Sequence, residues 1–311
     1  MIQRKLGQSD LMLSPLVLGG NVFGWTVSKE AAFDILDEFT DHGFNAIDTA
    51  NSYSKWAEGN NGGESETIIG EWLRKSGKRK KVLLFTKVGD ETPEGKGLSQ
   101  AQITLQIELS LKRLQTDHVD VYFSHRDDHI TPVEETLTAY DKLISQGKVR
   151  YIGISNFAST RMRESLNVAL HKNLPQYIAL QPRYNICDRN YEGECRTYAV
   201  KYGMGVVTYQ SLAGGFLTGK YKSEADLRKS ARGKSIANYL KDKLHIIEKL
   251  EKLSGDSGYP ASALSLAWVL QHDTITAPIA SATSVSQLEE LMRIAEPEIM
   301  QLPLKEVFAD N

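Results

Sequence analysis

The chain has 311 residues and a formal net charge of −2, with 24% charged and 41% hydrophobic residues. This composition is ordinary for a folded globular protein and excludes a fibrous or disordered chain. The balanced charge excludes a general polyanion-binding surface, so we expect no nucleic-acid partner. No linker-like or low-complexity stretch divides residues 1–311, so we expect one domain.

Nothing in the sequence indicates a membrane span or export. The best apolar run, Ala261–Leu270, falls short of the about 18 residues that a membrane helix needs. The N-terminus begins like a signal peptide, but Asp10 and Pro15 interrupt it and no cleavage site follows. Cys187 and Cys195 fit neither a CxxC motif nor a zinc spacing. We therefore expect a reduced, cytoplasmic protein without a metal site.

Short β-rich runs alternate with longer amphipathic stretches along the chain. Ahead of them, Arg4–Leu6 and Leu11–Ser14 flank a turn and predict a hairpin. The predicted strands are Leu16–Leu18, Ala46–Asp48, Val82–Lys87, Val119–Ser124, Tyr151–Ser155, Tyr177–Gln181, Val206–Tyr209 and Ile275–Pro278. The predicted helices are Lys29–His42, Glu64–Lys75, Ser99–Leu114, Val133–Gln146, Ser159–His171, Tyr191–Tyr202, Tyr239–Leu253 and Pro260–Gln271.

The spacing of these strands predicts their arrangement. The first six gaps between strand starts, 26 to 37 residues each, suit single βα units with parallel strands. The last gap of 69 residues is too long for one helix and includes a predicted loop, Ser211–Ser235. Eight such strands predict an α/β fold, a (β/α)8 TIM barrel with an N-terminal β-hairpin and a long loop after strand seven. A doubly wound sheet is the structural alternative.

Polar and aromatic residues stand at the ends of the predicted strands. They are Asp48, Lys87, His125, Ser155 with Asn156, Gln181 and Tyr209, and Tyr53 lies five residues after Asp48. Taken singly, each residue has a structural explanation. The aspartate could cap a turn, the lysine could be a solvated loop charge, and the histidine could have its hydrogen bonds made within the fold. In a barrel, however, the C-terminal strand ends form one rim, and the chemistry occurs there. Their convergence on that rim favours a functional site.

Four of these residues suit proton donation to an alkoxide. A free tyrosine has a pKa of about 10, and an adjacent ammonium such as Lys87 would lower that pKa for Tyr53. Asp48 would hold the lysine, and His125 would orient a carbonyl oxygen. Such a proton donor is needed when a hydride adds to an aldehyde or ketone.

The chain resembles the aldo-keto reductase family. The matching runs are Gly43–Ala50 with Tyr53, Thr86-Lys87, His125, Gly153–Phe157, Gln181–Asn185 and Leu212–Lys220. The chain is most similar to the bacterial branch that is itself similar to voltage-gated potassium channel β subunits. The resemblance implies a barrel that binds NADPH, with NADH less favoured, and reduces aldehydes and ketones to alcohols.

The resemblance also implies roles for individual residues. Tyr53 would be the general acid. Lys87 and Asp48 would adjust the pKa of Tyr53, and His125 would orient the carbonyl. The cofactor would be bound by Gly20, Asp48, Ser155, Asn156, Gln181, Tyr209, Gln210, Ser211, Leu212, Gly214, Leu217, Gly219, Lys220, Arg228, Ser281, Thr283, Gln287 and Glu290. The expected pocket walls are Phe23, Trp25, Trp56 and Tyr184, which suggest an apolar or aromatic carbonyl substrate.

Part of this expectation has support in the residues themselves. No GxGxxG motif occurs, so another segment would have to bind the phosphates of a dinucleotide. Lys220–Lys243 contains eight basic residues against three acidic ones, which suits an anionic cofactor or, alternatively, a solvated face. Many relatives carry an arginine near Thr283 and an asparagine where Leu291 stands. Arg228 or Arg232 would have to substitute for that arginine.

Three other motifs point to functions that we do not expect. Gly214–Lys220 matches most of a phosphate-binding P-loop, but Tyr221 stands where a magnesium-binding Ser or Thr is needed. His125 and His129 have the spacing of metal ligands on a helix, but the nearby Pro132 predicts a loop. The basic residues at 74–81 lie at a helix C-terminus without interleaved aromatics, as on a solvated face.

A second functional hypothesis belongs to another class. Like the channel β subunits, the chain could be an NADPH-binding, redox-sensing subunit with slow turnover. Because no extra segment precedes the hairpin, we expect the plain enzyme, which acts on a small-molecule carbonyl. The sequence leaves a homo-oligomer open.

Overall fold

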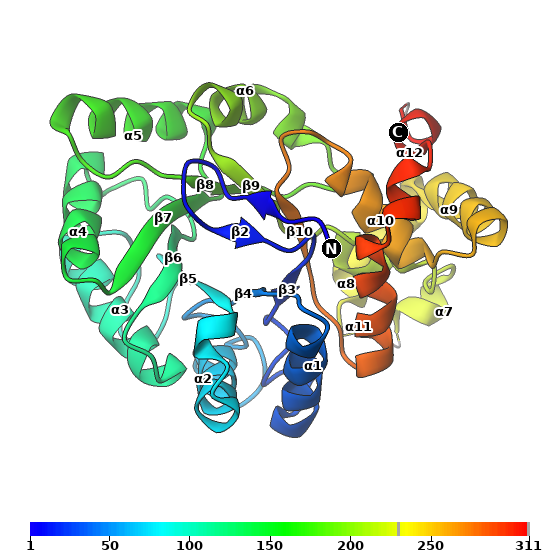
Figure 1. Cartoon of the computed structure of the whole chain (residues 1–311), viewed down its shortest axis with the longest axis horizontal. Helices are drawn as coiled ribbons and strands as arrows, with labels where there is room; N and C mark the ends of the chain where they lie inside the picture. Colours follow the sequence, from blue (N-terminus) through cyan, green and yellow to red (C-terminus); the bar gives the residue numbers. More distant parts are fainter. Residues whose placement is uncertain (229–230, 310–311) are drawn as a thin grey trace.

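Eight parallel strands close into a barrel in the computed structural model, which describes residues 1–228 and 231–309 (Figure 1). The strand order is β10-β3-β4-β5-β6-β7-β8-β9. The strands are β3 (Val17–Gly19), β4 (Ala46–Asp48), β5 (Leu83–Val88), β6 (Val119–Ser124), β7 (Val149–Ser155), β8 (Ala179–Gln181), β9 (Gly205–Thr208) and β10 (Ala277–Ala280). The predicted TIM barrel is confirmed, and each predicted strand overlaps an observed one.

Helices surround the barrel on its outside (Figure 1). They are α1 (Lys29–Asp41), α2 (Glu64–Ser76), α3 (Gln100–Leu114), α4 (Val133–Ser145), α5 (Ser159–Lys172), α6 (Glu194–Lys201), α7 (Glu224–Leu227), α8 (Gly233–Asp242), α9 (Leu244–Ser257), α10 (Ala261–Leu270), α11 (Val285–Met292) and α12 (Leu304–Val307). Serine side chains cap α1, α3 and α11: Ser28, Ser99 and Ser284 each accept a hydrogen bond from a backbone amide of the first turn.

Two predicted helices differ from the observed ones. The stretch predicted as one helix, Tyr239–Leu253, falls on α8 and α9, which are separated at Lys243 (φ −127°, ψ 17°). This break allows apolar side chains on both helices, Leu240 and Ile246, to be buried. Helix α6 starts later than predicted because Gly193 has a ψ of −136°, outside the helical region.

The N-terminal hairpin covers the barrel end where the strands begin. β1 (Arg4–Lys5) pairs antiparallel with β2 (Met12–Leu13), which confirms the predicted hairpin. Three buried leucines of this segment, Leu6, Leu11 and Leu13, join the apolar cluster inside the barrel. In Figure 1 the hairpin lies in front of the barrel. The opposite end, where the strands finish, is therefore the one available for a site.

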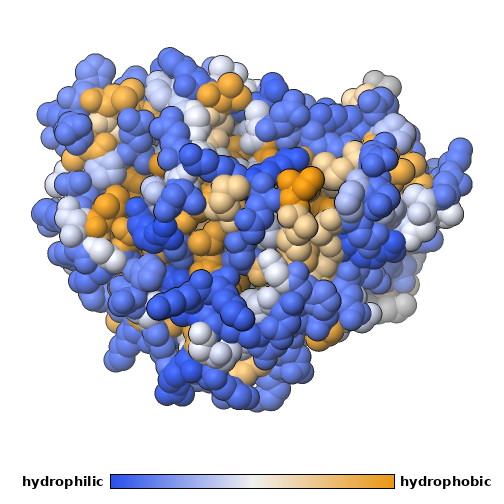
Figure 2. Space-filling model, in the orientation of Figure 1, coloured by the Kyte–Doolittle hydropathy of each residue, from blue (hydrophilic) through white to orange (hydrophobic). Residues whose placement is uncertain are grey.

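The face that carries the hairpin is mainly hydrophilic, with hydrophobic side chains scattered over it in small groups (Figure 2).

Within residues 1–228 and 231–309, no helix has the length and apolar character needed to cross a bilayer.

Candidate active site

The structure brings the four predicted catalytic residues together at the C-terminal strand ends. Lys87 donates hydrogen bonds to Asp48 Oδ2 at 2.6 Å, to Tyr53 Oη at 2.7 Å and to the Thr49 carbonyl at 2.9 Å. The Tyr53 hydroxyl donates to Asp48 Oδ2 at 3.3 Å. The His125 ring lies edge-on to the Tyr53 ring, with 5.9 Å between centroids. The Lys87 side chain has no exposed surface, so it belongs to a fixed buried cluster.

The pKa of Tyr53 is raised, whereas we expected Lys87 to lower it. Burial, followed by the nearby Asp48 carboxylate, raises the pKa of Tyr53 well above its ordinary value. Burial also lowers the pKa of Lys87, although Asp48 opposes this change. Because Asp48 already balances the ammonium, a Tyr53 phenolate would be a second anion in a poorly solvated cluster. Tyr53 therefore stays protonated, and it can still protonate an alkoxide, which is a stronger base than a phenolate.

His125 is uncharged at neutral pH. Burial lowers the pKa of His125 to about 3, and the positive charge of Lys87 acts in the same direction. The neutral imidazole can donate a hydrogen bond from one ring nitrogen and accept one at the other.

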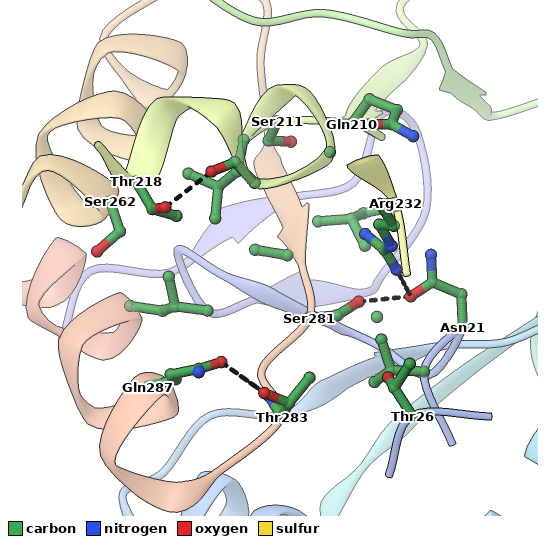
Figure 3. A pocket seen from close by; sticks show the side chains of 18 of the residues that line it. Asn21, Thr26, Gln210, Ser211, Thr218, Arg232, Ser262, Ser281, Thr283 and Gln287 are labelled. Atoms are coloured by element: carbon green, nitrogen blue, oxygen red, sulfur yellow. Dashed lines mark hydrogen bonds between the residues drawn. The ribbon is translucent and has the colours of Figure 1, made fainter. Parts of the chain in front are cut away.

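A cavity of about 600 Å³ adjoins this cluster. Its wall combines Asp48 and Tyr53 with the segments that follow β9 and β10. Figure 3 shows Gln210 and Ser211 of the first segment and Ser281 and Thr283 of the second. The predicted cofactor-binding residues in the wall are Asp48, Tyr209, Gln210, Ser211, Leu212, Gly214, Lys220, Ser281, Thr283, Gln287 and Glu290. The cavity thus extends from the proposed proton donor to the start of α11.

Three side chains from distant segments meet in the cavity wall. Ser281 donates a hydrogen bond to Asn21 Oδ1 at 2.7 Å, and Arg232 Nη2 donates to the same oxygen at 3.3 Å (Figure 3). The Arg232 guanidinium also lies 5.5 Å from the Trp25 ring centroid. Asn21 was missed from the sequence, although it directly follows two glycines at the end of the first barrel strand. Thr26, Thr218, Tyr221 and Ser262 also line the cavity and were not predicted.

Four predicted cofactor-binding residues at the ends of β7, β8 and β9 adjoin the site through hydrogen bonds. Gln181 Nε2 donates to Asp48 Oδ1 at 2.8 Å, and the Ser155 hydroxyl donates to the Gln181 carbonyl at 2.8 Å. The Tyr209 hydroxyl donates to Asn156 Oδ1 at 2.7 Å. These contacts join the ends of β7, β8 and β9 to the catalytic cluster.

Seven predicted cofactor-binding residues are not among those that line the cavity: Ser155, Asn156 and Gln181, whose contacts are given above, and four more. Leu217 is fully buried in the apolar layer, and Arg228 is exposed on the surface. Gly20 is a packing position, since a Cβ there would lie 2.8 Å from Ser65 Oγ. Gly219, with a φ of 78°, ends the 3₁₀ segment Ala213–Thr218. Of the basic run, Lys229 and the side chain of Lys234 lie outside the described residues.

Of the four expected aromatic walls, Trp25 lines the cavity and Trp56 lies beside it. Trp25 lines the cavity and packs edge-on against Trp56, with 5.6 Å between ring centroids. Trp56 is 48% exposed and lies 6.1 Å from the Tyr53 ring, so the two indoles border the site.

The other two expected walls, Tyr184 and Phe23, are fully buried instead. The Tyr184 hydroxyl donates to Glu192 at 2.6 Å, and its ring packs 5.3 Å from that of Trp268. Phe23 belongs to the apolar layer between the barrel and its helices. Both side chains therefore stabilise the fold and do not border the cavity.

The histidines with metal-like spacing face different carboxylates. His125 Nδ1 lies 3.3 Å from Asp90, and His129 Nδ1 lies 2.8 Å from Asp127. In the described residues, no group of three His, Cys, Asp or Glu side chains is arranged to hold a metal ion.

Comparison with known proteins gives a consistent result. A model of the aldo/keto reductase family matches residues 15–307. The oxidoreductase YrpG of Bacillus subtilis is 38% identical over 300 residues, which cover 94% of this chain and 90% of that protein. A probable voltage-gated potassium channel subunit beta of Arabidopsis thaliana is 33% identical, covering 95% of this chain and 92% of that protein. Aldo-keto reductase AMT2 of Alternaria alternata is 30% identical, covering 93% and 86%.

Proposed function

Because this chain belongs to the aldo-keto reductase family, we propose that it is an NADPH-dependent reductase that converts aldehydes and ketones to alcohols. The observation that carries the proposal is the buried Lys87, which bonds both Asp48 and Tyr53 in the wall of a cavity. This arrangement gives a protonated phenol a fixed position beside space for a substrate.

The chain's own residues provide the proton and its position. When bound, the nicotinamide supplies the hydride that reduces the carbonyl carbon. Tyr53 donates its proton to the carbonyl oxygen, while the hydrogen bond from Lys87 keeps the phenol in place. The Tyr53 hydrogen makes only a long bond to Asp48, 3.3 Å, so it is readily redirected to a substrate oxygen. His125 positions the substrate beside Tyr53.

The cavity wall fits an anionic dinucleotide. It contains two cations, Lys220 and Arg232, and a series of hydroxyl groups. It also reaches Thr283 at the start of α11, where helix amides favour a phosphate. The cations support NADPH over NADH because the extra phosphate adds negative charge.

The test is a titration of the purified protein with NADPH and NADH, followed by turnover with a panel of aldehydes, ketones and sugars. We expect tighter binding of NADPH and repeated turnover with at least one class of carbonyl. Absence of nicotinamide binding, or of turnover with every carbonyl, would contradict the proposal.

The relative from Arabidopsis thaliana favours a second candidate, a redox-sensing subunit that binds NADPH and turns over slowly. The same preparation separates the two candidates. Tight NADPH binding with slow turnover in a four-fold ring would favour the sensor. Repeated turnover by a monomer or dimer would favour the enzyme.

A further inference from the structure

The residue that directly follows Tyr53 has a backbone conformation that serine rarely adopts. Ser54 has a φ of 71°, in the left-handed region that favours glycine, and it has no exposed surface. A non-glycine residue in this region is strained, and the conformation persists only where the surrounding structure requires it. The contacts of the Ser54 side chain supply that requirement.

The Ser54 hydroxyl fastens the turn that carries Tyr53 to a second loop. It donates a hydrogen bond to the backbone carbonyl of Phe23 at 2.7 Å. Asn60 Nδ2 joins the same two loops, because it donates to the Gly24 carbonyl at 2.8 Å and to the Ser54 carbonyl at 3.1 Å. A glycine at position 54 would adopt the backbone conformation without strain, but it would have no hydroxyl for this bond.

The second loop is also part of the cavity wall. It follows β3 and contributes Asn21 and Trp25 to the wall of the cavity. The bond from Ser54 therefore fixes the backbone beside Tyr53 relative to the wall at which a dinucleotide would bind. Lys87 fixes the other end of the same side chain, since its ammonium donates to the Tyr53 hydroxyl at 2.7 Å.

We propose that Ser54 is a positioning residue that sets the distance between the Tyr53 hydroxyl and the cofactor-binding wall. This inference rests on the proposed reductase function. The hydride and the proton are delivered to the two bonded atoms of one carbonyl group, so their donors must be correctly spaced. A displacement of about 1 Å in a reacting group can reduce a rate about a hundredfold. The bond to Phe23 offsets the strain of the left-handed serine.

The first test removes the hydroxyl and measures a single turnover. Ser54→Ala or wild-type protein is saturated with NADPH and mixed with a reactive aldehyde. We expect the rate in Ser54→Ala to fall about tenfold or more, while the Kd for NADPH stays within about twofold of the wild-type value. Ser54→Gly removes the same hydroxyl without backbone strain, so it provides a second variant if the alanine protein fails to fold. A wild-type rate in either folded variant would overturn the proposal.

A double-mutant cycle tests whether Ser54 acts through Tyr53. In a Tyr53→Phe background there is no phenol hydroxyl to position, so adding Ser54→Ala should cause no further loss of rate. Losses that multiply in the double variant would reject the positioning role and leave the reductase function intact. A wild-type rate in Tyr53→Phe alone would instead reject the proton-donor role on which the proposed function depends.

A matched control is Ser9→Ala. The Ser9 hydroxyl also donates to a backbone carbonyl, that of Leu6, at 2.7 Å, and Ser9 is 1% exposed. It lies in the hairpin segment at the opposite end of the barrel. Loss of either buried bond should lower the melting temperature, but only Ser54→Ala should slow the single turnover. An equal loss of rate in Ser9→Ala would show that the effect is general destabilisation and would contradict the proposal.

Discussion

The two ends of the barrel are closed by different kinds of side chain, apolar at one end and charged at the other. Where the strands begin, leucines of the hairpin continue the apolar interior of the barrel. Where the strands finish, Lys87 and Asp48 bury a charged pair under Tyr53 and a cavity. The apolar end gains stability from each contact that it makes. At the charged end, burial of the ion pair has a desolvation cost that its hydrogen bonds must offset. The same buried charged groups make this the end that can perform chemistry.

Removal of the buried cation should have the largest effect. Lys87→Met leaves Asp48 buried without its partner, so the free energy of unfolding should fall by about 3–5 kcal/mol and turnover should be lost. Denaturant titration and steady-state kinetics measure the two effects. Lys78→Met is the control, because Lys78 pairs with Asp37 and Asp41, whose side chains are 50% and 62% exposed, and should contribute at most about 1 kcal/mol. A stable Lys87→Met protein would show that the charged end carries no such cost.

The apolar end should affect stability alone. Leu13→Ala opens a cavity in the fully buried barrel core and should reduce the free energy of unfolding by about 2–5 kcal/mol. Its kcat, corrected for the folded fraction, should equal that of the wild type. Met12→Ala alters the neighbouring residue, which is 42% exposed, and should change stability by only about 0.5 kcal/mol. A large loss of kcat in folded Leu13→Ala would mean that the two ends are coupled.

Cofactor affinity should depend on the cation that lines the cavity. In Arg232→Gln we expect the Kd for NADPH to rise about tenfold, while kcat at saturation stays close to the wild-type value. Arg228→Gln removes an exposed arginine that does not line the cavity, and its Kd should not change. Fluorescence titration compares the two variants. Equal effects would indicate a diffuse electrostatic attraction and no specific site.

The pH dependence should be the smallest effect. With a pKa of about 3, His125 stays neutral from about pH 5 to about pH 8, so kcat should not change over this range. The raised pKa of Tyr53 keeps the phenol protonated at higher pH as well. Activity should instead decline where Lys87, whose pKa is lowered, loses its proton. A fall in kcat centred near about pH 6.5 would show that a charged His125 is required.

Much of the fold could be predicted because the number of residues between predicted strands directly indicates βα units. The strand ends also identified Asp48, Lys87 and His125, since parallel strands bring their last residues to one rim. Spacing does not show which way a side chain packs, so Tyr184 was expected in the pocket although it packs on Trp268. Asp90 stands beyond the end of β5, where no pattern distinguishes it from a loop carboxylate.

The pKa of Tyr53 could not be predicted from residue types because it depends on a balance. The sequence shows that a cation and an anion are both present. It does not show that the Tyr53 hydroxyl is buried, or that the Asp48 carboxylate lies beside it and 2.6 Å from Lys87 Nζ. Only the distances and the burial of the cluster establish that the pKa rises.

The most direct test of the central claim is the rate of a single turnover in Tyr53→Phe. The enzyme saturated with NADPH is mixed with a reactive aldehyde, and oxidation of the nicotinamide is followed by absorbance. Loss of the phenol hydroxyl should lower the rate by about a hundredfold or more, while the Kd for NADPH stays unchanged. A Tyr53→Phe enzyme that reduces the aldehyde at the wild-type rate would contradict the account.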